Sequence, residues 1–103
     1  MTLEDLKNRC ENAGFKYAYG VFKKPTEPPH LVAICQNTDN FMADKKVYSK
    51  DMPIQLDYTY LVKDLDEQNK IEDEILCDIA WNKSEETYLS DEEIWQVSYF
   101  FEI

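Results

Sequence analysis

The chain has 103 residues, which is enough for one small domain and too few for two separate cores. Acidic residues outnumber basic ones by 21 to 11, so the net charge is −10 with the one histidine neutral. This charge disfavours binding to bare nucleic acid, because phosphate contacts need clustered Lys and Arg side chains. Seven Tyr, five Phe and two Trp residues supply core material for a folded chain rather than a disordered one.

The first predicted element is a helix over residues 3–13. Thr2 and Asp5 have the spacing of a capping box, with Asp in place of the usual Glu or Gln. Gly14 supplies a stop signal after the last turn. Apolar residues recur at helical spacing and define one buried face: Leu3, Leu6, Cys10 and Ala13.

Two strands are predicted next, on either side of a proline-rich loop. Residues 15–21 alternate between aromatic or apolar and polar or small side chains, which is typical of a strand. The loop at 23–29 contains three prolines, which interrupt strand pairing. Residues 30–36 are nearly all apolar, so we expect a central strand that is covered on at least one face.

The strongest strand signal covers residues 54–62, where every second residue is apolar or aromatic. Asp64 and Glu67 then predict the start of an acidic helix that runs through Ile71, Ile75 and Ile79. Residues 80–88 are compatible with a strand, residues 90–93 with a turn, and residues 94–103 alternate again as a closing strand.

This order predicts a single α+β domain over residues 1–103. We expect one antiparallel or mixed sheet of about four to five strands, with two helices packed on one face. The second face of the sheet is then open, and some of the aromatic side chains are expected on it as a protein contact surface. The candidates are Tyr17, Tyr19, Phe22, Tyr58 and Tyr60.

Catalytic and cofactor motifs are missing from the sequence. His30 is the only histidine, and Cys10, Cys35 and Cys77 are widely spaced, so neither a Cys–His pair nor a zinc site is indicated. The cysteines lie in apolar patterns and are expected to be small buried residues without disulfides. Only two glycines are present, too few for a phosphate-binding loop. We therefore expect no enzymatic activity and no cofactor.

One acidic segment has a partial calcium-loop spacing. Asp64, Asp66 and Gln68 match positions one, three and five of an EF-hand loop. Asn69 stands where the loop needs Gly, and Ile75 stands where it needs a bidentate Glu. The segment is therefore interpreted as a solvated helix start, and no metal site is predicted.

Targeting and membrane signals are also lacking. The first residues are acidic where a signal peptide is basic. The longest apolar run, residues 31–35, is far below the roughly 20 residues that a membrane span needs. We expect a protein of the cytosol, or one assembled from it, with no membrane contact.

Residues 41–48 carry a family resemblance. The segment Phe41-Met42-Ala43-Asp44-Lys45-Lys46-Val47-Tyr48, followed by the strand at 54–62, resembles small proteins encoded in the head–tail joining region of long-tailed bacteriophages and prophages. These belong to the tail terminator, or tail completion, family. The family pattern is an aromatic-x-Ala-Asp-x-x-Val-Tyr stretch, and Lys45 stands where Asn or Asp is expected. The general layout of a preceding helix, a following acidic helix and two closing strands is also similar.

The resemblance implies a structural virion protein without catalysis. Members form a homo-oligomeric ring, usually sixfold, on the last disc of the tail tube. The ring stops polymerisation of the tail-tube protein and offers a docking surface to the head connector protein. The implied location is the tail or neck of the virion, assembled in the cytoplasm of the bacterial host, with no sequence-specific binding to nucleic acid.

Four residues of this segment are candidate protein-interface residues. Phe41 and Met42 are apolar residues in a polar stretch, which favours a contact with another protein. Asp44 and Tyr48 are included with them, although a purely structural interpretation is open, in which Asp44 caps a turn and Tyr48 enters the core.

A different class of interaction protein is the alternative. A small acidic domain can mimic DNA and occupy the basic groove of a nucleic-acid-handling protein. Acidic residues cluster at 64–78 and 85–93 rather than spacing evenly along one extended face, which disfavours this alternative unless folding aligns the two clusters.

Overall fold

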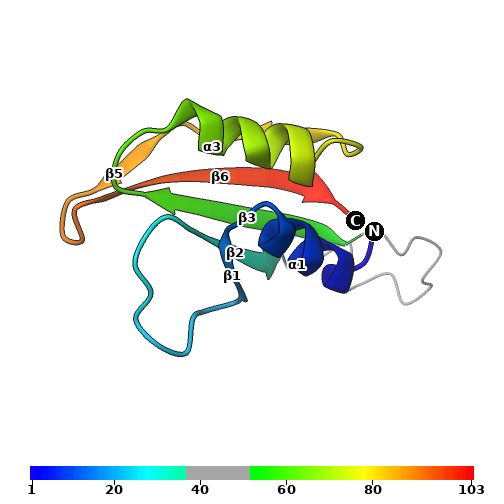
Figure 1. Cartoon of the computed structure of the whole chain (residues 1–103), viewed down its shortest axis with the longest axis horizontal. Coiled ribbons are helices and arrows are strands. Elements are labelled where there is room, and N and C mark those ends of the chain that lie inside the picture. The colour runs from blue at the N-terminus through cyan, green and yellow to red at the C-terminus, as the bar shows by residue number, and fades with distance from the viewer. Residues whose placement is uncertain (37–51) are drawn as a thin grey trace.

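The computed structural model describes residues 1–36 and 52–103. Two helical segments cover one face of a sheet whose strands run along the long axis of the molecule (Figure 1). The described elements, in chain order, are α1 Leu3–Asn12, β1 Lys16–Tyr19, β2 His30–Cys35, β3 Pro53–Tyr60, α3 Leu65–Lys70, the π-helix η1 Ile71–Ile75, β4 Trp81–Lys83, β5 Thr87–Leu89 and β6 Ile94–Glu102.

The sheet is mixed and has six strands in the described residues, in the order β1-β2-β3-β6-β4, with β5 also paired to β6. The α+β class and the mixed sheet agree with the sequence prediction, with more strands than the four to five expected. β1 and β2 are parallel, and all other pairs are antiparallel. The predicted strand at 80–88 is two short strands along one edge of β6, separated by residues 84–86.

The capping box predicted at the first helix is present. The Asp5 backbone N–H donates to Thr2 Oγ1, and the Thr2 N–H donates to Asp5 Oδ2, both at 3.0 Å. Two of the free N–H groups at the helix start are thereby satisfied. Leu6 and Cys10 of α1 are fully buried, so the predicted apolar face is the one that packs on the sheet.

The second helix starts as predicted and then changes from an α-helix to a π-helix. The Asp64 carboxylate accepts hydrogen bonds from the backbone N–H groups of Asp66 and Glu67, which caps α3. From Ile71 the helix becomes the π-helix η1, where the Leu76 N–H donates to the Ile71 carbonyl at 3.0 Å. The extra residue in this turn lets both Ile75 and Leu76 enter the core.

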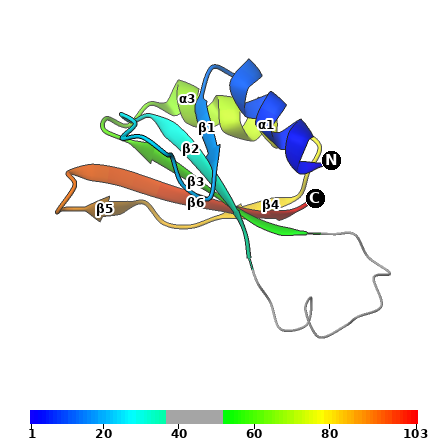
Figure 2. The same ribbon diagram turned by 90° about the horizontal axis from the view of Figure 1, so that it is seen from below.

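The core lies between the sheet and the helices, and Figure 2 shows both helices on the same side of the strands. Alternate residues of the three central strands point into it, as the period of a strand requires. The buried apolar strand residues are Leu31, Ala33, Ile54, Leu56, Tyr58, Tyr60, Val97, Tyr99 and Phe101.

The expectation of aromatic side chains on the open sheet face is wrong for the four tyrosines, whereas Phe22 contacts His30, whose register position is on that face. Tyr58 and Tyr60 are buried under the helices, with 0% and 1% of their surface exposed. Tyr17 and Tyr19 pair with the core residues Leu31 and Ala33 in the β1–β2 register, so they lie on the helix side too. Tyr58 and Tyr60 can be buried because glutamates on the rim of the core accept hydrogen bonds from their hydroxyl groups, as described below.

Candidate interaction surface

The residues that border segment 37–51 meet at one end of the sheet. The Gln36 N–H donates to the Pro53 carbonyl at 2.8 Å, and Met52 and Ile103 exchange two backbone hydrogen bonds of 2.7 and 3.0 Å. Figure 1 places both chain ends at this same end of the molecule. The four predicted interface residues, Phe41, Met42, Asp44 and Tyr48, lie outside the described residues.

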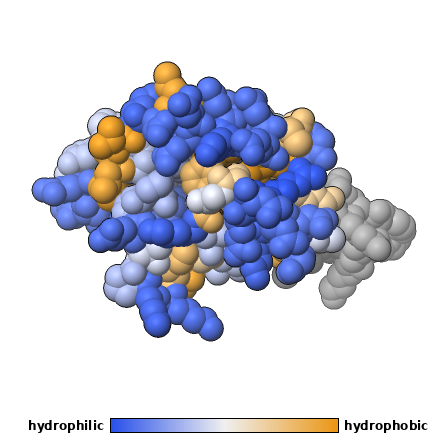
Figure 3. Space-filling model, in the orientation of Figure 1, coloured by the Kyte–Doolittle hydropathy of each residue, from blue (hydrophilic) through white to orange (hydrophobic). Residues whose placement is uncertain are grey.

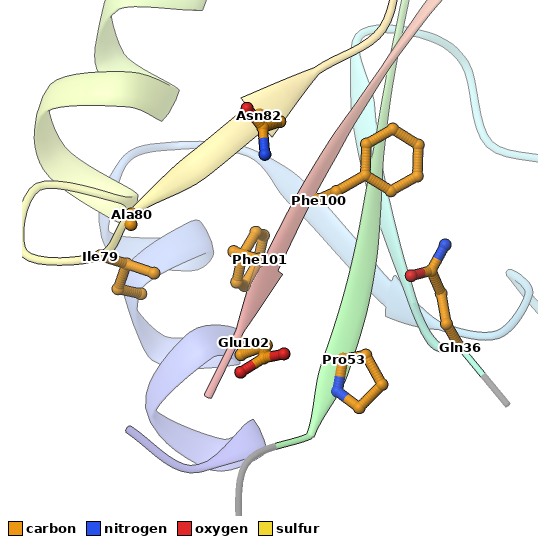
Figure 4. Close-up of a pocket in the computed structure, with 8 residues that line it drawn as sticks. All are labelled: Gln36, Pro53, Ile79, Ala80, Asn82, Phe100, Phe101 and Glu102. Atoms are coloured by element: carbon orange, nitrogen blue, oxygen red, sulfur yellow. The ribbon is translucent and has the colours of Figure 1, made fainter. Parts of the chain in front are cut away.

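An open hollow of about 410 Å³ lies at this end of the sheet (Figure 4). Phe100 and Phe101 come from neighbouring positions of β6 and project to opposite sides of it. Phe101 is 5% exposed and belongs to the core, whereas Phe100 lies half-buried on the open face. The lining residues are Gln36, Pro53, Ile79, Ala80, Asn82, Phe100, Phe101 and Glu102.

The open face next to the hollow carries a chain of polar side chains across three strands. Gln36 Nε2 donates to Gln55 Oε1 at 3.5 Å, and Gln55 Nε2 donates to Asp57 Oδ1 at 2.8 Å. Ser98 Oγ donates to the same Asp57 oxygen at 2.6 Å. These bonds fix the amide and hydroxyl groups, so this part of the open face is polar and ordered. By register, Val32, Ile34 and Phe100 lie on the same face as apolar neighbours.

His30 and Cys10 lack the environment of reactive groups, whereas Cys77, which was expected to be buried, is exposed. Burial lowers the pKa of His30, whose ring contacts Phe22 at 5.0 Å and whose Nδ1 has no hydrogen-bond partner. Burial also raises the pKa of the Cys10 thiol to about 12, which keeps it protonated and unreactive at neutral pH. Across residues 1–36 and 52–103, no group of three or more His, Cys, Asp or Glu side chains could hold a metal ion.

Three glutamates at the edge of the core accept hydrogen bonds from buried tyrosines. Tyr58 Oη donates to Glu67 at 2.7 Å, Tyr60 Oη to Glu86 at 2.5 Å, and Tyr99 Oη to Glu72 at 2.8 Å. Burial first, and the glutamate partners second, raise the pKa of all three phenols. Three of the acidic side chains therefore stabilise the fold through hydrogen bonds to buried tyrosines.

The opposite end of the molecule exposes apolar side chains. Leu61 and Val62, in the β3–α3 connection, are 54% and 78% exposed, and Leu65, the first residue of α3, is 63% exposed. Leu61 and Val62 border a second hollow of about 260 Å³ that Pro28 and Pro29 also line. Figure 3 shows apolar surface over the β3–α3 connection at the upper left, surrounded by hydrophilic residues.

This apolar end was not identified from the sequence. The alternation through Val62 predicted a longer strand with Val62 on its buried face, but β3 ends at Tyr60. The signal that could have identified it is the pair Leu61-Val62, which breaks the alternation directly before the polar cap at Asp64.

Comparison of the chain with protein-family models and with curated protein sequences found no match. No helix within the described residues is long and apolar enough to cross a membrane.

Proposed function

We propose that this chain is a non-enzymatic structural protein of the tail terminator, or tail completion, type. In this proposal, copies form a ring, usually sixfold, that ends tail-tube polymerisation and joins the tail to the head connector of a long-tailed phage or prophage. The sequence basis is the resemblance over residues 41–48.

The structural observation that carries the proposal is that the two ends of the molecule expose different surfaces. One end has the open hollow with its mixed polar and apolar lining, both chain ends and the borders of segment 37–51, and the other has the apolar group Leu61, Val62 and Leu65. A protein between a tube and a connector needs two separate contact surfaces of different chemistry. An elongated domain with unlike ends supplies them.

The charge distribution is compatible with a ring through which DNA passes. Residues 52–103 contain 14 acidic and 3 basic residues, a net charge of −11, whereas residues 1–36 contain 4 acidic and 5 basic residues, a net charge of +1. Carboxylates that face the lumen of a ring repel the phosphate backbone. The DNA then slides through without adhering to the wall.

The DNA-mimic alternative is less well supported. A mimic needs rows of free carboxylates to meet a basic groove. Here Glu67, Glu72 and Glu86 accept hydrogen bonds from buried tyrosines, and Asp78 pairs with Arg9. These carboxylates have structural partners within the chain.

The test is a stop codon early in the gene, in the phage or prophage that encodes it, followed by electron microscopy of the induced lysate. We expect tails of irregular, extended length without attached heads, and we expect the intact chain supplied from a plasmid to restore joined virions. Tails of normal length joined to heads in the absence of the chain would contradict the proposal. Co-purification of the tagged chain with a basic nuclease or repressor, without virion proteins, would favour the mimic.

A further inference from the structure

The two outer edges of the sheet, as the described residues form it, are chemically unlike. Among the described residues, no strand pairs with the outer side of β1 or with the outer sides of β4 and β5. Figure 2 shows β1 and β5 on opposite sides of the sheet, separated by β2, β3 and β6. Free strand edges of this kind are ready sites for association with another chain.

The edge formed by β1 is basic. It has three exposed lysines, and Glu27 is the one acidic residue between residues 12 and 36. Lys16 Nζ donates to the Glu27 carbonyl at 3.1 Å, and the contact of Phe22 with His30 holds the following loop against the first residue of β2. Tyr19 and Val21 are 49% and 74% exposed. We define the basic edge as Lys16, Tyr19, Val21, Lys23 and Lys24.

The edge formed by β5 and its turn into β6 is acidic. Residues 84–103 contain no Lys or Arg, and the turn at 90–93 carries three consecutive acidic residues. The rings of Tyr88 and Trp95 contact each other at 5.1 Å and are 48% and 37% exposed. We define the acidic edge as Tyr88, Asp91, Glu92, Glu93 and Trp95.

We propose that copies of this chain associate head-to-tail, with the basic edge of one copy against the acidic edge of the next. Each edge offers exposed apolar side chains beside charges of one sign, and the signs are opposite. The charged groups of the two edges form no ion pair within the described residues, so they are available to a neighbour. This inference rests on the proposed ring and assigns the surfaces that close it.

The charge pattern also selects the type of symmetry. Two basic edges or two acidic edges repel each other, which disfavours a twofold dimer of like surfaces. Contacts between unlike edges are heterologous and generate a ring when the rotation closes. By register, Tyr19 and Trp95 both lie on the helix side of the sheet. When two copies are placed edge to edge with their helices on the same side, Tyr19 of one copy and Trp95 of the next are therefore on the same side of the joint.

The first test maps the contact in the unmodified chain. An equal mixture of unlabelled and isotope-labelled protein is cross-linked at high concentration with a carbodiimide, which joins a lysine directly to a carboxylate that it contacts. We expect mixed-label peptides that link Lys16, Lys23 or Lys24 to Asp91, Glu92 or Glu93. Intermolecular cross-links only between other positions, or none at all, would overturn the proposal.

The second test uses charge reversal, with association measured by sedimentation at one protein concentration. We expect K23E/K24E and D91K/E92K each to weaken self-association by at least about tenfold. An equal mixture of the two variants should recover association, because each reversed edge then meets an edge of opposite charge. Failure of the mixture to recover would overturn the proposal.

The controls reverse the same number of charges elsewhere. Lys7 and Lys70 are exposed on the helices, and Asp73 and Glu74 are exposed on η1. K7E/K70E and D73K/E74K should associate as the unmodified chain does. The two proposals fail separately, since the tail-length assay reports on the ring's role in the virion, whereas cross-linking and sedimentation report on the edges alone.

Discussion

The guanidinium of Arg9 binds the carboxylate of Asp78 through two hydrogen bonds of 2.7 and 3.1 Å, and so connects α1 to the chain that follows η1. The same guanidinium donates to the Ile75 carbonyl at 3.0 Å. This pairing holds the pKa of Asp78 below its ordinary value, with the Arg9 hydrogen bond as the main cause. One side chain therefore joins the two helical segments that cover the sheet.

Arg9→Ala should lower the free energy of unfolding by about 1 kcal/mol. Most of the loss comes from the Ile75 carbonyl, because solvent screens the exposed ion pair. Arg9→Lys should recover only part of it, since an ammonium cannot form the two-pronged contact. The free energies of unfolding of both Arg9 variants are measured by urea denaturation, monitored by circular dichroism. The control is Lys7→Ala, a substitution at an exposed position of the same helix. An unchanged urea midpoint for Arg9→Ala would show that the contact does not stabilise the fold.

Tyr99→Phe should destabilise the fold by about 1–2 kcal/mol, because it removes a hydrogen bond from a fully buried ring to a charged carboxylate. Glu72 keeps its ion pair with Lys83, so the carboxylate is not left without a partner. Tyr88→Phe is the matched control, since Tyr88 is half-exposed. Equal urea midpoints for the two variants would refute the assigned role of the Tyr99 hydroxyl.

Stability should fall in alkali as the tyrosines ionise. Burial raises the pKa of Tyr17 to about 12, and raises the pKa of Tyr58, Tyr60 and Tyr99 well above the ordinary value of 10. The unfolded chain releases these protons first, so the stabilisation is complete below pH 10 and is lost as the pH rises above it. Tyrosinate absorbance should therefore rise together with the loss of the circular dichroism signal. Full ionisation near pH 10 in a chain that remains folded would contradict the burial of these rings.

Glu93→Gly should stabilise the protein by about 0.5–1 kcal/mol. Glu93 has a φ of 57°, which is a left-handed backbone conformation. This conformation is unfavourable for a residue with a side chain and is nearly free of strain for glycine. Glu92→Gly is the control, because Glu92 does not have this conformation and glycine there only adds freedom to the unfolded chain. Thermal unfolding of both variants provides the measurement, and a lower melting temperature for Glu93→Gly than for the unmodified chain would contradict the prediction.

Local features of the fold could be predicted from the sequence because local residues determine them. The Thr2–Asp5 cap, the Asp64 cap and the alternation of the long strands each depend on residues a few positions apart. The parallel pairing of β1 with β2 and the break between β4 and β5 depend on tertiary contacts. The same holds for the buried tyrosines, since nothing in the strand pattern indicates that Glu67 and Glu72 meet their hydroxyl groups.

Less of the candidate site could be predicted. The choice of Phe41 and Met42 as interface residues stays a prediction, because both lie outside the described residues. The exposed residues Leu61 and Val62 were assigned to a strand, and only the position at which β3 ends exposes them. The basic and acidic edges are separated in the sequence by most of the chain, and only the strand order places them on opposite sides of one sheet.

The polar chain from Gln36 to Ser98 also determines what the open face resists. If another sheet stacked face to face on this surface, as sheets do in amyloid, the Asp57 carboxylate and the Gln55 amide would be buried. These two groups already form a hydrogen bond with each other. Removing a carboxylate from water without a positively charged partner is unfavourable in free energy. Face-to-face stacking of sheets is therefore disfavoured even at high protein concentration. Within residues 1–36 and 52–103, this polar chain therefore lets the open face stay in contact with water at high protein concentration.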